Sequence, residues 1–370
     1  MYYVVAILGL AVLMVVHEAG HYLAARSAGL RVTRFSIGFG PTFFKVQPID
    51  GFWWFTTAGE RVKWKLMKHD PERHGPTVFQ VALIPFLAYV QIAGMNPLED
   101  IDPQDRGSYA NARLRSRIFT IFAGPLANYL FASVFFFLPY YLEGRAVLST
   151  HVDVVEGMPA AAAGLKAGDR IVEIDGRAVE WWESMAEEIS KNPERSIPVV
   201  VEREGQRLSF DIVPAQREGR GQIGVRPGPG MKQSVVPLSF GEAATLSLER
   251  PPQVVKFALS GMVELVRGKS DAKLGGPKLI VDEMKKAAEL GWTEFFGILG
   301  SMSAYLAAFN LLPFPALDGG RLMFLGYEAT TRKRANPTVE AHIHAIGLAM
   351  LLGLMIYVTF ANDFGLAGSK

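Results

Sequence analysis

The chain has 370 residues, of which 49% are hydrophobic and 20% are charged, and its formal net charge is +2. Such a small net charge gives no electrostatic reason to expect a nucleic-acid partner. The absence of cysteine excludes disulfides and cysteine-ligated zinc.

The apolar residues gather into four blocks that carry no charged side chain, at 2–16, 118–142, 295–316 and 345–361. A helix needs roughly 20 apolar residues to cross the hydrocarbon core of a bilayer. With their flanking residues, the blocks predict four membrane spans over 1–25, 117–142, 292–317 and 339–361. The first block has no basic segment before it and no small-residue cleavage site, so we expect a retained helix rather than a signal peptide.

Clusters of Lys and Arg indicate how these spans are oriented. The clusters are Arg26, Arg31 and Arg34 after the first span, Arg113, Arg115 and Arg117 before the second, and Arg332, Lys333 and Arg334 between the third and fourth. The positive-inside rule places all three on the cytoplasmic side. Residues 143–290 then lie on the opposite side of the membrane.

The cytoplasmic loop, residues 26–116, carries strand signals. Polar and apolar residues alternate in "RVTRFSIGFGP" at 31–41 and in "GERVKWKL" at 59–66. A third β-rich run, "TVFQVALIPFLAYVQIAG" at 77–94, is apolar enough to be buried against membrane or protein. Pro85 indicates an edge strand or a break in this run.

Residues 146–228 have the pattern of one small extracytoplasmic α/β domain. Asp175-Gly176 and Glu204-Gly205 are hairpin turn signals, and "WWESMAEEISKN" between them predicts a helix. The segment "PAAAAGLKAGDRIVEIDG" resembles the PDZ domains of bacterial membrane and periplasmic proteases. A linker with amphipathic helices should follow over 229–291. Pro251 and Pro252 can open one such helix, which would lie on the membrane surface or pack against the domain.

The stretch "HEAGH" at 17–21 is the clearest chemical signal. On a helix, His17 and His21 lie on one face one turn apart, as two ligands of one zinc ion do. Glu18 lies beside them and can take a proton from a metal-activated water. The plain alternative is a histidine pair at the membrane interface, which leaves Glu18 unexplained. Ionisable groups in a membrane span are costly and usually functional.

A catalytic zinc ion usually has a third protein ligand and one open position. The remaining histidines show no partner motif. Asp318, in "NLLPFPALDGG" at 310–320, follows the third span on the same side as His17 and His21. Pro313, Pro315 and two glycines should break the helix there, as is tolerated around an enclosed cavity. Taken alone, Asp318-Gly319-Gly320 also fits an ordinary turn.

Together, "HEAGH", "FAGPLAN" at 122–128 and "NLLPFPALDGG" resemble the site-2 protease family of intramembrane zinc metalloproteases, in the same order along the chain. The single PDZ-like domain narrows the resemblance to the bacterial regulator-of-sigma-E protease type. This resemblance implies His17, His21 and Asp318 as Zn²⁺ ligands, Glu18 as general base and Asn310 as a substrate-contacting residue. It also implies a membrane-associated β-sheet in the cytoplasmic loop, whose free edge, here "PFLAYVQIAG", receives the substrate as an added strand.

The resemblance further implies a multi-pass protein of the bacterial cytoplasmic (inner) membrane, with its active site near the cytoplasmic side. Its substrate would be a single-pass membrane protein, such as an anti-sigma factor after a first-site cut, or remnant signal peptides. The PDZ-like domain would exclude bulky ectodomains. Gly124 and Pro125 would kink the second span, and Asn128 is expected to be structural.

Two other functions fit parts of the sequence. A non-enzymatic PDZ-containing scaffold would need neither Glu18 nor Asp318. A membrane-anchored peptidase for soluble substrates would not need the polytopic layout.

Overall fold

The computed structural model describes residues 1–60, 62–71, 75–217, 219–267 and 275–360. The chain divides into two compact units, Met1–Pro139 together with Ala244–Lys370, and Tyr140–Ala243. The first is called the helical unit below, and the second is called the Tyr140–Ala243 unit.

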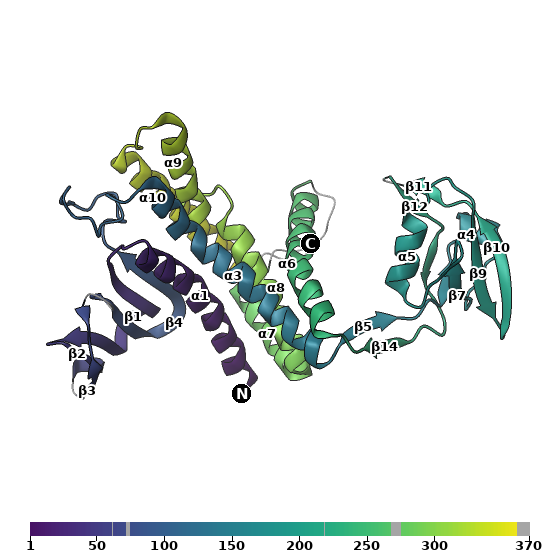
Figure 1. The fold of residues 1–370 in the computed structure, drawn as a ribbon, viewed down its shortest axis with the longest axis horizontal. Coiled ribbons are helices and arrows are strands. Elements are labelled where there is room, and N and C mark those ends of the chain that lie inside the picture. Colours follow the sequence, from purple (N-terminus) through teal and green to yellow (C-terminus); the bar gives the residue numbers. More distant parts are fainter. Residues whose placement is uncertain (61, 72–74, 218, 268–274, 361–370) are drawn as a thin grey trace. The chain divides into compact units, whose positions relative to one another are not determined.

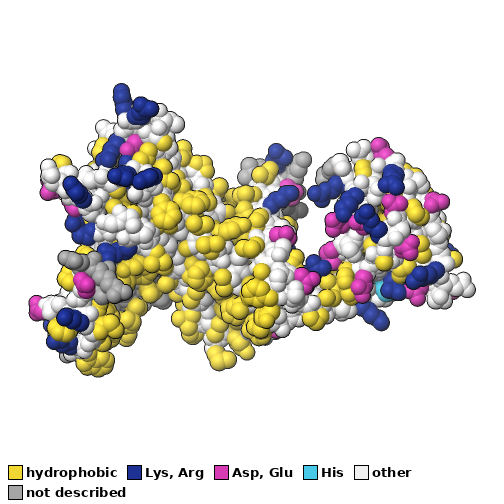
Figure 2. Space-filling view, viewed as in Figure 1, with side chains coloured by type: hydrophobic (Ala, Val, Ile, Leu, Met, Phe, Trp, Pro, Cys, Tyr) yellow, Lys and Arg dark blue, Asp and Glu magenta, His cyan; other side chains and the backbone are white. Residues whose placement is uncertain are grey.

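In the described part of the chain, three helices are long and apolar enough to cross a membrane: α1 (Tyr2–Ser27), α3 (Leu114–Leu142) and α10 (Pro337–Val358). They coincide with the first, second and fourth predicted spans. Helix α10 begins after Asn336, whose side chain accepts hydrogen bonds from the backbone N–H groups of Thr338 and Val339. The last predicted residue of that span, 361, lies outside the described residues. Figure 2 shows hydrophobic side chains over the helices of this unit, as a lipid-facing surface requires.

The third predicted span contains the shorter helix α8 (Trp292–Asn310), which is not among these three. Glu294 lies in its first turn, and the backbone leaves the helix at Leu311. Whether α8 crosses the membrane therefore stays a prediction. Residues 311–317 form the expected break, in which Ala316 has a positive φ of 76°.

The predicted position of the two glycines in this break was wrong. Gly319 and Gly320 lie in the first turn of the next helix, α9 (Asp318–Thr331). A Cβ atom at Gly319 would overlap with the backbone oxygen of Leu312. These glycines therefore let the start of α9 pack tightly onto the preceding loop, rather than breaking a helix.

Helix α1 packs closely against its neighbours. A Cβ atom at Gly20 would overlap with the backbone of Ala123 in α3. At its other end, α1 contacts α7 (Pro277–Leu290) and α8. Ala6, Leu13, Met284 and Leu299 are buried in one cluster here, to which α3 adds Phe135. Small residues that bring helix backbones together are typical of membrane helix packing.

A four-stranded sheet lies against α1 (Figure 1). Its order is β3-β2-β1-β4, and the strands are β1 (Val32–Ile49), β2 (Phe52–Thr57), β3 (Lys63–Lys68) and β4 (Val78–Ile92), with a short 3₁₀ turn at Ala58–Glu60. The three predicted strand regions are thus confirmed.

The two halves of β4 pair with different parts of β1. Residues 78–82 lie opposite both 34–37 and 42–46, whereas 88–92 lie opposite 32–37 alone. Pro85 separates the two halves, as its position in the sequence indicated. Among the described residues, no second strand pairs with 88–92, so this segment is an open sheet edge.

The Tyr140–Ala243 unit has its own core around Ile171, Ile174, Val199 and Val201. Its main sheet has the order β10-β9-β7-β8 and consists of β7 (Arg170–Ile174), β8 (Arg177–Ala178), β9 (Ile197–Arg203) and β10 (Gln206–Ile212). The other elements are β5 (Arg145–Leu148), β6 (Val152–Val154), α4 (Pro159–Ala162), α5 (Trp182–Ser190), β11 (Ala215–Arg217), β12 (Arg220–Gln222), β13 (Val225–Pro227) and β14 (Gln233–Val236). Both predicted hairpins and the predicted helix are present.

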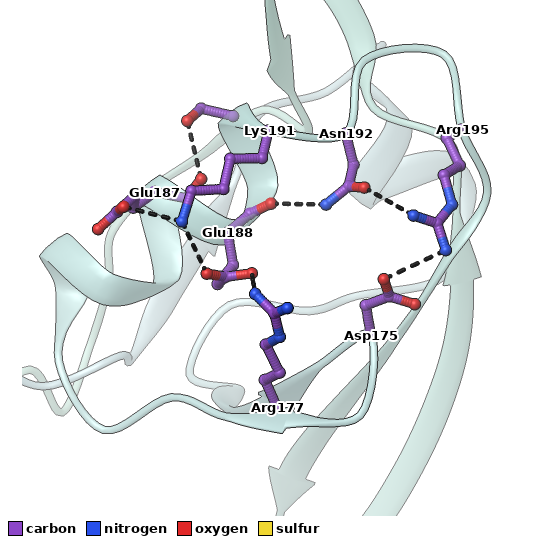
Figure 3. A network of polar contacts seen from close by, with 8 residues as sticks. Asp175, Arg177, Glu187, Glu188, Lys191, Asn192 and Arg195 are labelled. Atoms are coloured by element: carbon purple, nitrogen blue, oxygen red, sulfur yellow. Dashed lines mark hydrogen bonds and ion pairs between the residues drawn. The ribbon is translucent and has the colours of Figure 1, made fainter.

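This unit is wider than the predicted 146–228 domain. Strand β14, which falls in the predicted 229–291 linker, pairs with β5 and so belongs to the unit. A polar network also ties α5 to neighbouring loops (Figure 3). Glu188 accepts from Arg177 and Lys191, and Arg195 pairs with Asp175.

Helix α6 (Phe240–Val266) begins before the prolines that were expected to open it. The reason is a capping box that the sequence analysis missed. The Ser239 hydroxyl accepts a hydrogen bond from the Glu242 backbone N–H. In return, the Glu242 carboxylate accepts one from the Ser239 backbone N–H. Pro251 and Pro252 consequently lie inside the helix.

Asp169→Asn should lower the free energy of unfolding of the Tyr140–Ala243 unit by about 2–3 kcal/mol at neutral pH. The buried Asp169 carboxylate accepts two 2.7 Å hydrogen bonds from Arg203, which the variant weakens. Burial acts to raise the pKa of Asp169, but Arg203 and the Lys166 backbone N–H hold it below its ordinary value of 3.8. The stabilisation is therefore present above that pH and is lost as the pH falls below it.

Urea unfolding of the 140–243 segment at several pH values measures this difference. Asp211→Asn, at an exposed position of β10, is the matched control and should change stability by less than about 0.5 kcal/mol. A difference for Asp169→Asn that persists undiminished at acidic pH would contradict the ion-pair explanation.

Candidate metal centre

Helix α1 places His17 and His21 on one buried face, with 8% and 7% of their surfaces exposed. The spacing of four residues produces this arrangement, because residues at i and i+4 lie one turn apart. The third group, Asp318, is the first residue of α9 and follows the loop broken by Pro313 and Pro315. Two elements distant in sequence therefore meet at one point.

Three atoms converge there. Asp318 Oδ2 lies 3.1 Å from His17 Nε2 and 3.2 Å from His21 Nε2, and the two Nε2 atoms are 3.2 Å apart. A tetrahedral ion with ligands at about 2.0–2.1 Å separates its ligand atoms by about 3.3 Å. His17, His21 and Asp318 thus fit three vertices of such a site, and they form the group of described residues that could hold a metal ion.

The proton positions agree with a metal site. His21 Nδ1 lies 2.8 Å from the backbone oxygen of Thr120, which can only accept. A neutral His21 therefore carries its proton on Nδ1 and directs a lone pair from Nε2 towards Asp318.

Asn128 of α3 orients the other imidazole. Its Nδ2 atom lies 3.2 Å from His17 Nδ1, and its buried Oδ1 atom has no hydrogen-bond partner among the described residues. With the amide oxygen and nitrogen exchanged, Oδ1 accepts a hydrogen bond from Nδ1–H of His17. His17 Nε2 is left with a lone pair, as a metal ligand requires.

Gly124 makes room for His21. A Cβ atom at Gly124 would overlap with the His21 imidazole, and with its Nε2 atom most closely. The backbone of α3 thus forms the wall behind the ligand atom, and any larger side chain would displace it.

The three ligand candidates open into a hollow of about 470 Å³. Its other lining residues include Glu18 beside the histidines, Asn310 at the end of α8, and Ala88, Tyr89 and Val90 of the open β4 edge. An extended peptide on this edge would therefore pass the three ligand candidates and Glu18.

The structure brings together all five residues singled out in the sequence, His17, Glu18, His21, Asn310 and Asp318. The sequence analysis treated Asn128 only as structural and missed two other residues. Arg321 lines the hollow. His344 of α10 accepts a 3.0 Å hydrogen bond from the backbone N–H of Ala316, in the loop before Asp318. A histidine and an asparagine within apolar spans were the available signals.

Comparison with protein families decides the identity of the chain. The model of peptidase family M50 matches residues 5–59 and 52–354. The chain belongs to peptidase family M50. This family relationship covers both the histidine-bearing helix and the Asp318 loop.

Curated M50 relatives match nearly the whole chain. A protein of Agrobacterium fabrum that carries the name of a zinc metalloprotease is 31% identical, covering 99% of this chain and 97% of the relative. A protein of Rhizobium meliloti, named in the same way, is also 31% identical, covering 96% and 94% of the two chains. The protease eep of Enterococcus faecalis is 28% identical, covering 95% and 96%.

Gly124→Ala should weaken metal binding by about 10- to 100-fold, because the added methyl group displaces the His21 ligand atom. The measurement is the metal content of purified protein after dialysis against graded concentrations of a chelator. Gly297→Ala is the matched control, since a Cβ atom at this position in α8 meets no atom within 4 Å. Equal metal retention by the two variants would refute the role of Gly124.

Proposed function

We propose that this M50 peptidase is an intramembrane zinc metalloprotease of the site-2 type. His17, His21 and Asp318 bind Zn²⁺, Glu18 is the general base, and Asn310 contacts the substrate. It hydrolyses peptide bonds in or near the membrane segment of single-pass membrane proteins.

One observation carries this proposal. Three lone-pair atoms meet within 3.2 Å in a buried position, with Glu18 and an open sheet edge on the same hollow. Asp318 Oδ2 is buried and has no hydrogen-bond partner among the described residues, and a carboxylate buried in this way beside two imidazoles is costly unless a cation satisfies it. The zinc metalloprotease names of the relatives support zinc as that cation.

The chemistry of the site follows from its residues. A bound zinc ion lowers the pKa of water towards 7 and polarises the scissile carbonyl. Glu18 takes the proton of the attacking water and delivers it to the leaving amine. The Asn310 amide donates a hydrogen bond to the oxygen that develops negative charge. Asn128 holds the imidazole of His17 in the orientation that binding needs.

The open edge of β4 determines the form of the substrate. A helical segment hides its carbonyl groups in hydrogen bonds, so it must unwind before it can be cut. Residues 88–92 offer backbone groups to an extended peptide, which would be added as one more strand. The substrate thus reaches Glu18 as a strand rather than as a helix.

The remaining features complete the proposal. Helix α8 would be the third of four spans, and the Lys and Arg clusters support a metal centre near the cytoplasmic side. The bacterial relatives support a protein of the bacterial inner membrane. The Tyr140–Ala243 unit is an extracytoplasmic PDZ-like domain that excludes bulky ectodomains. An anti-sigma factor after a first-site cut is the proposed substrate, with remnant signal peptides as a second class. The motif resemblance supports this choice of substrate.

Glu18→Gln should lower the rate of cleavage of a model single-pass membrane substrate by about 10²- to 10⁴-fold, because it removes the general base. Its zinc content should equal that of the wild type, since Glu18 is not a ligand. Glu294→Gln, exposed in the first turn of α8, is the matched control and should cut normally. Cleavage is followed with purified enzyme in detergent or vesicles, and zinc by elemental analysis.

The other functional classes give different outcomes. A scaffold would bind the substrate without cutting it in either form. A peptidase for soluble substrates would cut an unstructured soluble peptide at least as fast as the membrane substrate. Equal cleavage by the wild type and Glu18→Gln would overturn the assigned role of Glu18.

A further inference from the structure

A second cavity, of about 380 Å³, lies beside the candidate metal centre in the helical unit. Met95 and Arg321 line both this cavity and the hollow at His17, His21 and Asp318, which is called the catalytic hollow below. The two spaces therefore share a wall. The lining of the second cavity includes Asn96, Tyr109, Arg117, Glu328, Arg334 and Glu340.

Arg321 differs from the other guanidinium groups of this cavity. Arg117 forms a buried ion pair with Glu328, and Arg334 Nε lies 3.6 Å from the same carboxylate. In the described part of the chain, the half-buried Arg321 side chain has neither an ion pair nor a hydrogen bond. Among the three arginines of this cavity, Arg321 is thus the one that forms no ion pair with a described residue.

Arg321 lines the second cavity together with Tyr109 and Glu340, and it also lines the catalytic hollow at His17, His21 and Asp318. Its side chain therefore lies on the wall that the two spaces share.

The open sheet edge leads into this cavity. Residues 88–92 form the edge, Ile92 and Met95 line the catalytic hollow, and Gly94, Met95 and Asn96 line the second cavity. A peptide paired with the edge and continuing past Met95 consequently enters the cavity that Arg321 borders.

We propose that this cavity binds the part of the substrate that continues past Met95, and that Arg321 selects an acidic side chain there. This inference rests on the proposed function, because it requires a peptide on the β4 edge. A planar guanidinium binds a carboxylate through two parallel hydrogen bonds, and such charge-assisted bonds are strong where water is partly excluded. An Asp or Glu side chain of the substrate supplies the ion-pair partner that Arg321 lacks among the described residues.

Glu340 opposes this selection. It lies on the same cavity and feels the charge of Arg321, but it forms no ion pair among the described residues. Its carboxylate repels an incoming acid and competes for Arg321. Removing Arg321 and removing Glu340 should therefore change the preference for acidic substrates in opposite directions, which a merely structural role of either residue would not produce.

The test uses the full-length protein and a panel of model single-pass substrates. Each substrate carries Asp or Lys at one position flanking the mapped cleavage site, in an otherwise constant sequence. The ratio of cleavage rates for the Asp and Lys substrates is measured within each enzyme variant, so overall activity cancels. Zinc content is measured for every variant, because Asp318 lies one turn from Arg321.

The wild type should cut the Asp substrate about tenfold faster than the Lys substrate for at least one position on one side of the cut. Arg321→Gln should bring that ratio close to 1, Arg321→Glu should invert it, and Glu340→Gln should raise it. Lys333→Gln removes an exposed charge between α9 and α10 outside the cavity and should leave the ratio unchanged.

Two results overturn the inference alone: a wild-type ratio near 1 at every position, or an Arg321→Gln variant that keeps the wild-type ratio while retaining zinc. If the wild type retains zinc and cuts no substrate of the panel, the proposed function fails and the inference fails with it. If the wild type cleaves the substrates without charge preference, the inference fails while the proposed function stands.

Discussion

The convergence of three acceptor atoms on one buried point is the constraint on which the rest of the helical unit depends. Two imidazoles and a carboxylate lie within 3.2 Å of one another, contributed by α1 and α9. Burying such groups is costly unless a cation satisfies them. The surrounding structure serves this point: the Thr120 backbone and Asn128 orient the imidazoles, and Gly124 leaves the space that His21 occupies.

A protease inside a membrane must also present an extended chain to its catalytic groups. The open edge at residues 88–92 meets this need, because a sheet edge offers unpaired backbone groups that a helix does not. The same edge runs past the three ligand candidates and leads to the cavity that Arg321 borders. Cutting and selection would then follow each other along one strand, with Glu18 acting at the first site and Arg321 at the second.

Local patterns predicted much of this arrangement. The spacing of His17 and His21, the three apolar helices and the strands of the cytoplasmic loop all follow from short stretches of sequence. Features that depend on distant partners were not predictable in the same way. The overlap that restricts Gly124, the contact between Asn128 and His17, and the pairing of β14 with β5 each join segments far apart in the chain. The early start of α6 is different, since its capping box was visible in the sequence and was overlooked.

The coordination of zinc in the purified protein tests the central claim most directly. X-ray absorption at the zinc edge should show two imidazole nitrogens and one carboxylate oxygen at about 2.0–2.2 Å, with a fourth light ligand. Loss of one imidazole in His17→Ala, and of the carboxylate in Asp318→Ala, would match the account. A spectrum of the wild type without imidazole scattering, or one that neither substitution alters, would contradict it.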